Sequence, residues 1–124
     1  PRRRARPRGA AASSGRGRAT GGPNGEWALA FAAELGRSDY WLLAIDTDGI
    51  DGASAAAGAL LDPAALGRLT PARIERSLAA HDSHGLLGAV GGLLVTGPTR
   101  TNVNALRIVL FPHPHGGGDG TRPA

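Results

Sequence analysis

The segment WLLAIDTDGIDG, residues 41–52, decides how the chain is expected to fold. Its first five residues are continuously apolar, which is typical of a strand that is buried on both faces. The polar loop begins abruptly at Asp46, so the pattern indicates a buried strand that delivers a loop. Residues 93–95 repeat the pattern ahead of the polar loop TGPTRTNVN (residues 96–104), and residues 107–111 (RIVLF) indicate a third strand.

Helices are expected on both sides of these strands. Apolar residues recur at helical spacing from Asn24 to Leu35, with Asn24 or Gly22 as the N-cap and Gly36 as the stop. Residues 53–61 (ASAAAGALL) predict a small-residue helix. Two short helices are expected after Asp62-Pro63 and Thr70-Pro71, because each pair places a capping residue before a proline, and another from Asp82 or Ser83 to Val90.

This alternation predicts a single α/β domain, with a mixed or parallel sheet flanked by short helices, over residues 21–111. If the strands are parallel, the loops 46–52 and 96–104 emerge at the same carboxyl edge, where open α/β sheets bind ligands. The Arg-rich segment 1–20 and the Gly/Pro-rich tail 112–124 lack apolar periodicity, so we expect the first to be disordered and the second flexible.

Composition excludes several classes of site. The chain has no Cys, which excludes disulfides, thiolate nucleophiles and iron–sulfur clusters, and no Lys, which excludes a P-loop. Seven of its fourteen Arg residues precede residue 19, and the remainder carries seven Arg against ten acids, so a nucleic-acid-binding face on the domain is not expected. Without a long apolar run, a soluble cytoplasmic protein is expected. The Ala-rich core is lean, which suggests that a partner surface contributes stability.

Three polar motifs are candidates for chemistry. GGPNGE (residues 21–26) places free helix amides where they attract a phosphate or carboxylate, or is an ordinary capped turn. The carboxylates of Asp46, Asp48 and Asp51 are suited to binding Mg²⁺ with phosphate or to acting as a general base, or form a solvated turn. The loop 96–104 groups hydroxyls, amides and one Arg that suit a small polyhydroxy acid, or bonds to itself.

Two further features are weaker. His81 and His84 lie three residues apart, as two metal ligands on a helix do, but no third ligand is evident nearby. The N-terminal arginines suit RNA or an acidic partner, but a solvated tail is the favoured explanation, and nucleic-acid binding is not our expectation.

Taken in order, the motifs resemble one known family. GG-x-N-x-E-x-A-L-A, TDGIDG followed by AAGA, DS, and LLVTGPT-x-TNVN-x-L-R resemble the MOFRL domain over residues 21 to about 111. That domain is the C-terminal part of glycerate 2-kinases, some of which are labelled hydroxypyruvate reductase. The resemblance implies ATP-dependent phosphorylation of the 2-hydroxyl of D-glycerate with Mg²⁺, in a cleft completed by a preceding Rossmann-like domain that carries the catalytic lysine.

The resemblance also implies site residues and a limit. Asp48 and Asp51 are the expected catalytic residues; the expected substrate-binding residues are Asn24, Glu26, Thr47, Gly49, Thr99, Arg100, Thr101, Asn102 and Asn104. Pro23 stands where the family usually has Arg, and Arg100 is one candidate to replace that charge. Without the preceding domain the chain is expected to be inactive alone. The alternatives are a decayed or orphan MOFRL-type binding or structural module and, least supported, hydroxypyruvate reduction.

Overall fold

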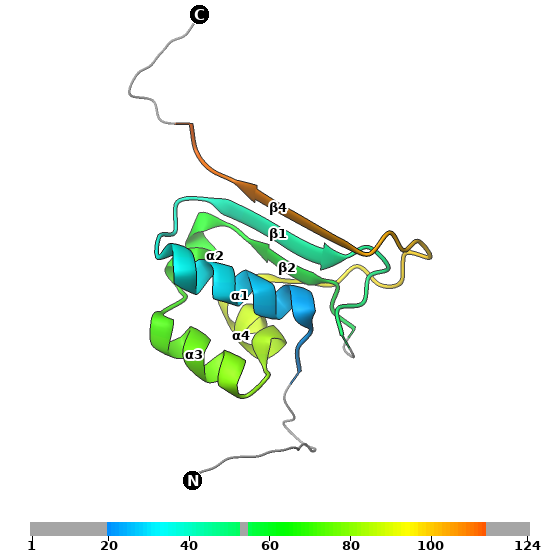
Figure 1. Cartoon of the computed structure of the whole chain (residues 1–124), viewed down its shortest axis with the longest axis horizontal. Coiled ribbons are helices and arrows are strands. Elements are labelled where there is room, and N and C mark those ends of the chain that lie inside the picture. The colour runs from blue at the N-terminus through cyan, green and yellow to red at the C-terminus, as the bar shows by residue number, and fades with distance from the viewer. Residues whose placement is uncertain (1–19, 53–54, 114–124) are drawn as a thin grey trace, which may run out of the picture.

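The structure, a computed structural model, describes residues 20–52 and 55–113. The elements in chain order are α1 (Pro23–Leu35), β1 (Trp41–Asp46), β2 (Gly58–Leu61), α2 (Pro63–Gly67), α3 (Pro71–Ala79), α4 (Ser83–Val90), β3 (Leu93–Leu94) and β4 (Ala105–Leu110) (Figure 1). Most of the two terminal segments for which we expected disorder lies outside the described residues. The expected α/β class with short helices is confirmed.

The direction of the strands differs from our expectation. The sheet has the order β3-β2-β1-β4, and each of its three strand pairs is antiparallel. A parallel pair needs a crossover that returns the chain to the starting edge, usually through a helix. The connection after β1 instead folds back on itself, because the amides of Asp46 and Asp51 donate to the carbonyl oxygens of Ala57 and Ala56.

The helix expected at residues 53–61 is wrong, because residues 55–57 are not helical and Gly58–Leu61 form β2. Ala and Leu favour helices locally, but tertiary packing overrides that preference. Gly58 has a φ of 149°, and a Cβ there would overlap the carbonyl oxygen of Ala44 on the neighbouring strand. The small side chain of Ala59 is wholly buried, so the run of small residues serves close packing of the sheet.

The other helices begin and end as their local sequence predicts. Asp62 and Thr70 accept hydrogen bonds from the amides of Ala65 and Arg73, as capping residues before proline should. Gly22 is the N-cap of α1 without a side-chain cap, and Gly36 ends that helix with a φ of 70°. Asp82 precedes α4 but does not cap it with its side chain.

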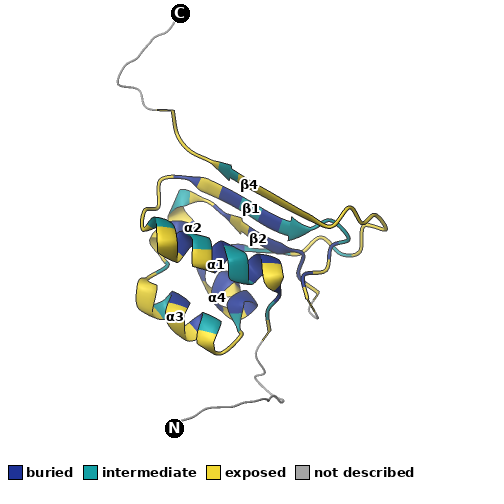
Figure 2. Cartoon of the chain, viewed as in Figure 1, coloured by how far each residue is buried: buried dark blue, intermediate teal, exposed yellow. Residues whose placement is uncertain are grey.

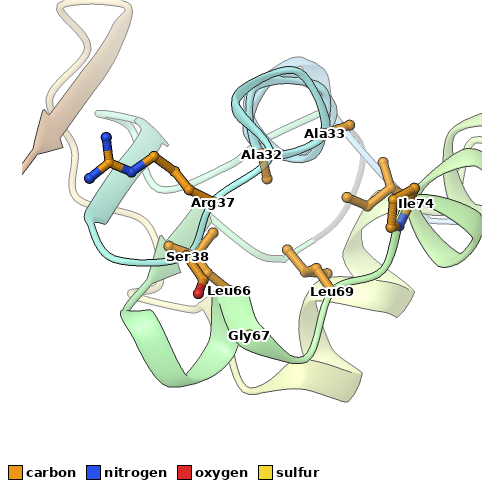
Figure 3. A pocket seen from close by; sticks show the side chains of 10 residues that line it. Ala32, Ala33, Arg37, Ser38, Leu66, Gly67, Leu69 and Ile74 are labelled. Carbon is orange, nitrogen blue, oxygen red and sulfur yellow. The ribbon is translucent and has the colours of Figure 1, made fainter.

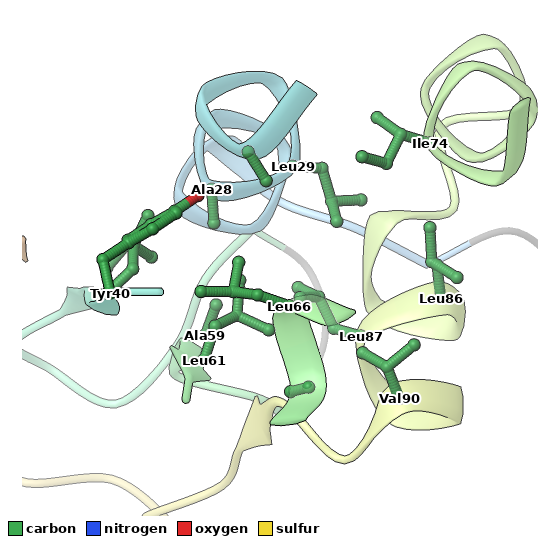
Figure 4. Packing of buried hydrophobic residues seen from close by; sticks show 14 residues of the cluster. Ala28, Leu29, Tyr40, Ala59, Leu61, Leu66, Ile74, Leu86, Leu87 and Val90 are labelled. Carbon is green, nitrogen blue, oxygen red and sulfur yellow. The ribbon is translucent and has the colours of Figure 1, made fainter. Parts of the chain in front are cut away.

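The core lies between one face of the sheet and the helices. Leu42 and Ala44 of β1 and Ala59 and Leu61 of β2 point to this face, and all four are at most 1% exposed. They pack against residues from all four helices, which include Leu29, Leu66, Ile74, Leu86, Leu87 and Val90 (Figure 4). The outer face of the helices and most of β4 are exposed (Figure 2).

Candidate functional site

The N-terminus of α1 meets the carboxylate of Asp51. Oδ1 of Asp51 accepts a hydrogen bond from the amide of Asn24 at 2.9 Å, and Oδ2 accepts one from Gly25 at 2.8 Å. Asp51 is 0% exposed. The free amides that the sequence offers to an anion therefore bind a carboxylate of the chain itself, which supplies the cap that Gly22 lacks.

His84 completes this arrangement from α4. Its Nε2 lies 2.9 Å from Oδ2 of Asp51, and its side chain is 2% exposed. Burial acts to raise the pKa of Asp51, but the hydrogen bonds from Asn24, His84 and Gly25 outweigh it and hold the pKa below its ordinary value. The ionised carboxylate thus ties α1, α4 and the loop after β1 together.

The glycines of the GGPNGE motif are explained by the same contacts. A Cβ on Gly22 would overlap the backbone of Asp51, and one on Gly25 would lie 2.8 Å from the ring of His84. Glycine is required at these two positions because the backbone of Asp51 and the ring of His84 approach the motif closely.

The side chain of Asn24 is also fully engaged. Its Nδ2 donates to Asp46 at 3.1 Å, and its Oδ1 accepts from Nε of Arg107 at 2.8 Å. The Arg107 guanidinium lies 4.8 Å from the centre of the Trp27 ring, within the range of a cation–π contact. Burial, followed by the neighbouring Asp51 carboxyl, raises the pKa of Asp46 above its ordinary value.

The loops 46–52 and 96–104 pack against each other at the end of the sheet. The Thr47 hydroxyl donates to the carbonyl oxygen of Asn104 and accepts from the amide of Val103, at 2.9 and 2.8 Å. The Thr99 amide donates to the carbonyl oxygen of Asp48 at 3.2 Å, and its hydroxyl donates to the carbonyl of Thr47. These bonds join two loops that are some fifty residues apart in sequence.

Gly49 makes the close approach of these loops possible. It has a φ of 90°, and a Cβ there would overlap the carbonyl oxygen of Gly97. Arg100 and Asn104 are non-glycine residues with positive φ, 65° and 76° respectively. Such backbone is uncommon, and it fixes the shape of the exposed second half of the loop 96–104.

The expected site residues differ in their burial. Asn24 and Asp51 are at most 1% exposed and hold the framework. Asp48 is half-buried, and Oδ1 accepts from the amide of Ile50 within its own loop. Five expected residues of the second loop are exposed, namely Thr99, Arg100, Thr101, Asn102 and Asn104. The carboxylate of Glu26 lies 3.4 Å from Nδ1 of His81.

Three residues of the hydrogen-bonded framework around Asp51 and Asn24 were not among the expected catalytic or substrate-binding residues, namely Asp46, His84 and Arg107. A histidine gives no sign of a carboxylate partner thirty-three residues away, and Arg107 lies in a strand pattern. Asp46 was considered only as a member of the acidic motif, and His84 only as one of two possible metal ligands.

The described residues do not assemble a Mg²⁺ site by themselves. Over residues 20–52 and 55–113, no three His, Cys, Asp or Glu side chains are grouped so that they could hold a metal ion. Both carboxylate oxygens of Asp51 already accept hydrogen bonds. We therefore derive no step through Mg²⁺ from this chain.

A cavity lies at the other end of α1. It has a volume of about 250 Å³ and is lined by residues around the C-terminus of α1, α2 and the start of α3, including Ala32, Leu66, Leu69 and Ile74 (Figure 3). Arg37 at its edge is already paired with Asp39. None of the expected site residues lines this cavity.

The fold and these loops define a small α/β domain that presents a hydrogen-bonded pair of polar loops beyond one end of its sheet. The chain belongs to the MOFRL family, whose pattern matches residues 11–105.

Relatives of the chain are considerably longer. It is 50% identical over 94 residues to an Agrobacterium vitis protein with the provisional name hydroxypyruvate reductase, covering 73% of this chain and 22% of that protein. It is 41% identical over 98 residues to the glycerate 2-kinase of Pyrococcus horikoshii, covering 77% and 22%. The crystal structure of glycerate kinase from Thermotoga maritima matches with a TM-score of 0.67 and 37% identity, covering 84% of this chain and 26% of that one. The chain thus spans about a quarter of the length of these relatives.

No helix in the described part of the chain is long and apolar enough to cross a membrane.

Proposed function

We propose that the chain is the C-terminal domain of a glycerate 2-kinase and forms one wall of the cleft in which ATP phosphorylates the 2-hydroxyl of D-glycerate. The observation that carries this proposal is the packing of the loop 46–52 against the loop 96–104, within a chain 41% identical to a glycerate 2-kinase. Its support is the hydrogen bond from the Thr99 amide to the backbone carbonyl oxygen of Asp48, which joins the backbone of Asp48 to a loop whose hydroxyl, amide and guanidinium groups are exposed.

The roles that we propose follow from accessibility. Asp48 accepts the proton of the glycerate 2-hydroxyl. The oxygen of that hydroxyl forms a bond to the γ-phosphorus of ATP while the bond between this phosphorus and the ADP oxygen breaks. Arg100 binds the carboxylate of glycerate or a phosphate oxygen, and Thr101 and Asn102 hydrogen-bond to the acid. Asp51, which the sequence suggested as a second catalytic residue, is instead a positioning residue, because it is buried beneath the α1 N-terminus.

Other expected residues also take framework roles in this proposal. Thr47, Gly49 and Asn104 hold the two loops together, and Asn24 anchors Asp46 and Arg107. Transfer of a phosphoryl group depends on positioning and on neutralising charge from all sides. A domain that supplies one wall is therefore expected to be inactive alone, and a Rossmann-like domain from the remaining sequence of such a kinase is the proposed partner. The cytoplasmic location stays a prediction.

The test is ATP-dependent formation of 2-phosphoglycerate from D-glycerate. We expect no product from the chain alone, but product when the whole chain replaces the matching segment of the Thermotoga maritima D-glycerate 2-kinase. In that chimera Asp48→Asn should reduce kcat by at least about a hundredfold, the usual range for a general base. The control Glu75→Gln changes an exposed carboxylate on α3 and should leave kcat unchanged.

An inactive chimera that unfolds cooperatively would contradict the kinase assignment and favour the decayed or orphan module. Unchanged kcat in Asp48→Asn would contradict the role of Asp48 alone.

A further inference from the structure

The sheet has a second face that is apolar and uncovered by the described helices. Five large side chains project from it: Trp41, Leu60, Leu106, Ile108 and Leu110, with exposed fractions of 45, 49, 42, 40 and 60%. We call these five residues the open face. They alternate with the residues that point to the helices, and the strand register places them side by side: Trp41 is opposite Leu110, and Leu43 is opposite both Leu60 and Ile108.

This composition is unusual for a sheet with only one covered face. An antiparallel sheet with one face in water normally alternates apolar and polar residues, so that the wet face is polar. Here β1 and β4 are apolar on the open face as well, and none of its five residues carries a charge or a hydrogen-bonding group other than the indole of Trp41. Contiguous apolar patches of this kind mark interaction surfaces. The pattern is that of a sheet made to be buried on both faces.

The rest of this chain has nothing suitable to cover the open face. Residues 1–19 and 114–124 contain no Leu, Ile, Val, Phe, Tyr or Trp, so neither segment offers a large apolar side chain. The glycerate 2-kinases to which the chain is similar are about 3.5 times its length, since the 98 and 99 matched residues make up 22% and 24% of them. The additional polypeptide in those relatives is long enough to supply an apolar surface that covers the open face.

We propose that the open face is the docking surface for the second domain of a protein of the relatives' length, which covers it with an apolar surface of its own. β1 ends and β4 begins at the loops 46–52 and 96–104. A domain seated on the open face therefore lies beside both loops, where it is able to supply the opposite wall of a shared cleft. Docking at the open face does not require kinase activity; it requires only that members of this family carry a second domain.

Thiol accessibility tests this directly, because the chain contains no cysteine. Leu60→Cys and Leu110→Cys each place a single thiol on the open face. Ala72→Cys places a matched thiol on the exposed surface of α3, on the other side of the molecule. The alkylation rate of each is measured in the whole chain alone and in the Thermotoga maritima chimera described above, by mass spectrometry of the peptide that carries the new thiol.

We expect the two open-face thiols to react at least about tenfold more slowly in the chimera than in the chain alone, because burial blocks the reagent. The Ala72→Cys thiol should keep its rate. Equal rates for the open-face thiols in both proteins, with cooperative unfolding of the chimera, would overturn the proposal. If the chimera does not fold, the chain mixed with the separately expressed remainder of the kinase replaces it, and unprotected thiols there also count against the proposal.

Two other outcomes are informative. Open-face thiols that become protected in the chain alone as its concentration rises, together with a dimer in sedimentation velocity, would assign the face to a second copy and overturn the proposal. If the open-face thiols of the chimera are protected but no 2-phosphoglycerate forms, the docking surface is supported and the proposed function is contradicted. If 2-phosphoglycerate forms but the thiols are not protected, the proposed function is supported and the docking surface is contradicted.

Discussion

Replacing Asp51 by alanine should destabilise the domain more than any change at the neighbouring acidic residues. The Asp51 carboxylate accepts the amides of Asn24 and Gly25 at 2.9 and 2.8 Å and faces Nε2 of His84 at 2.9 Å. With Asp51 0% exposed, no solvent reaches these donors to replace it. Asp51→Ala therefore leaves two buried amides and one imidazole without this acceptor.

The expected loss can be worked from these three contacts. Each of the three buried donors that loses its acceptor costs about 1–3 kcal/mol. These contributions overlap, so we expect the free energy of unfolding to fall by about 4 kcal/mol. A domain of this size is stable by roughly 5–13 kcal/mol in total. At a typical urea m-value of about 2 kcal/mol/M, the midpoint should fall by about 2 M.

The assay is urea unfolding followed by circular dichroism and by the fluorescence of Trp27 and Trp41. Asp48→Ala is the matched control, because Asp48 is half-buried and caps only the amide of Ile50 in its own loop, at 3.0 Å. Its loss should stay at or below about 1 kcal/mol. Equal losses of under 1 kcal/mol in both variants would refute the conclusion that Asp51 clamps the α1 N-terminus.

Three further predictions concern the loops, the acidic pair and the sheet. Gly49→Ala should destabilise the domain by about 1–3 kcal/mol, because the new Cβ meets the carbonyl oxygen of Gly97 at a positive φ; an unchanged urea midpoint would contradict the tight loop packing. Burial and the adjacent Asp51 raise the pKa of Asp46, so folding favours the protonated carboxyl more than the unfolded chain does, and this contribution to stability is lost as the pH rises from the ordinary pKa of a carboxyl through the raised pKa of the folded state. Asp46→Asn should therefore be more stable relative to the wild type at pH 7 than at pH 4, and the opposite trend in urea unfolding would refute this cause. Leu110→Ser should change the stability of the isolated chain by no more than about 0.5–1 kcal/mol, since the side chain is 60% exposed; a loss above 2 kcal/mol in thermal or urea unfolding would show that it already belongs to the core.

The helix ends could be predicted from the sequence because they depend on residues within one turn. Asp62-Pro63 and Thr70-Pro71 each combine an acceptor side chain with a proline that needs no amide partner, and both caps form. Gly36 ends α1 because its left-handed backbone is open to glycine at little cost. In each case the interacting atoms are neighbours along the chain.

The sequence could locate the loops of the candidate site but could not assign roles to their carboxylates. The loops 46–52 and 96–104 were expected at one edge of a parallel sheet, and hydrogen bonds do join them, although the strand pairs are antiparallel. Which carboxylate faces outward was not predictable, because nothing within the sequence DTDGIDG distinguishes Asp48 from Asp51. That difference arises from α1 and α4, which take up the buried carboxylate.

Local sequence thus specified the apolar strand segments, most helix boundaries and the family resemblance, because short-range hydrogen bonds and apolar periodicity carry that information. Tertiary packing specified the antiparallel sheet, the strand Gly58–Leu61 in place of a helix, and the burial of Asp51. These features depend on atoms that the chain brings together from dozens of residues apart, and their free energies exceed the small local preferences of alanine and leucine for a helix. The apolar open face belongs to the same group, since only the assembled sheet shows that its second side is left uncovered.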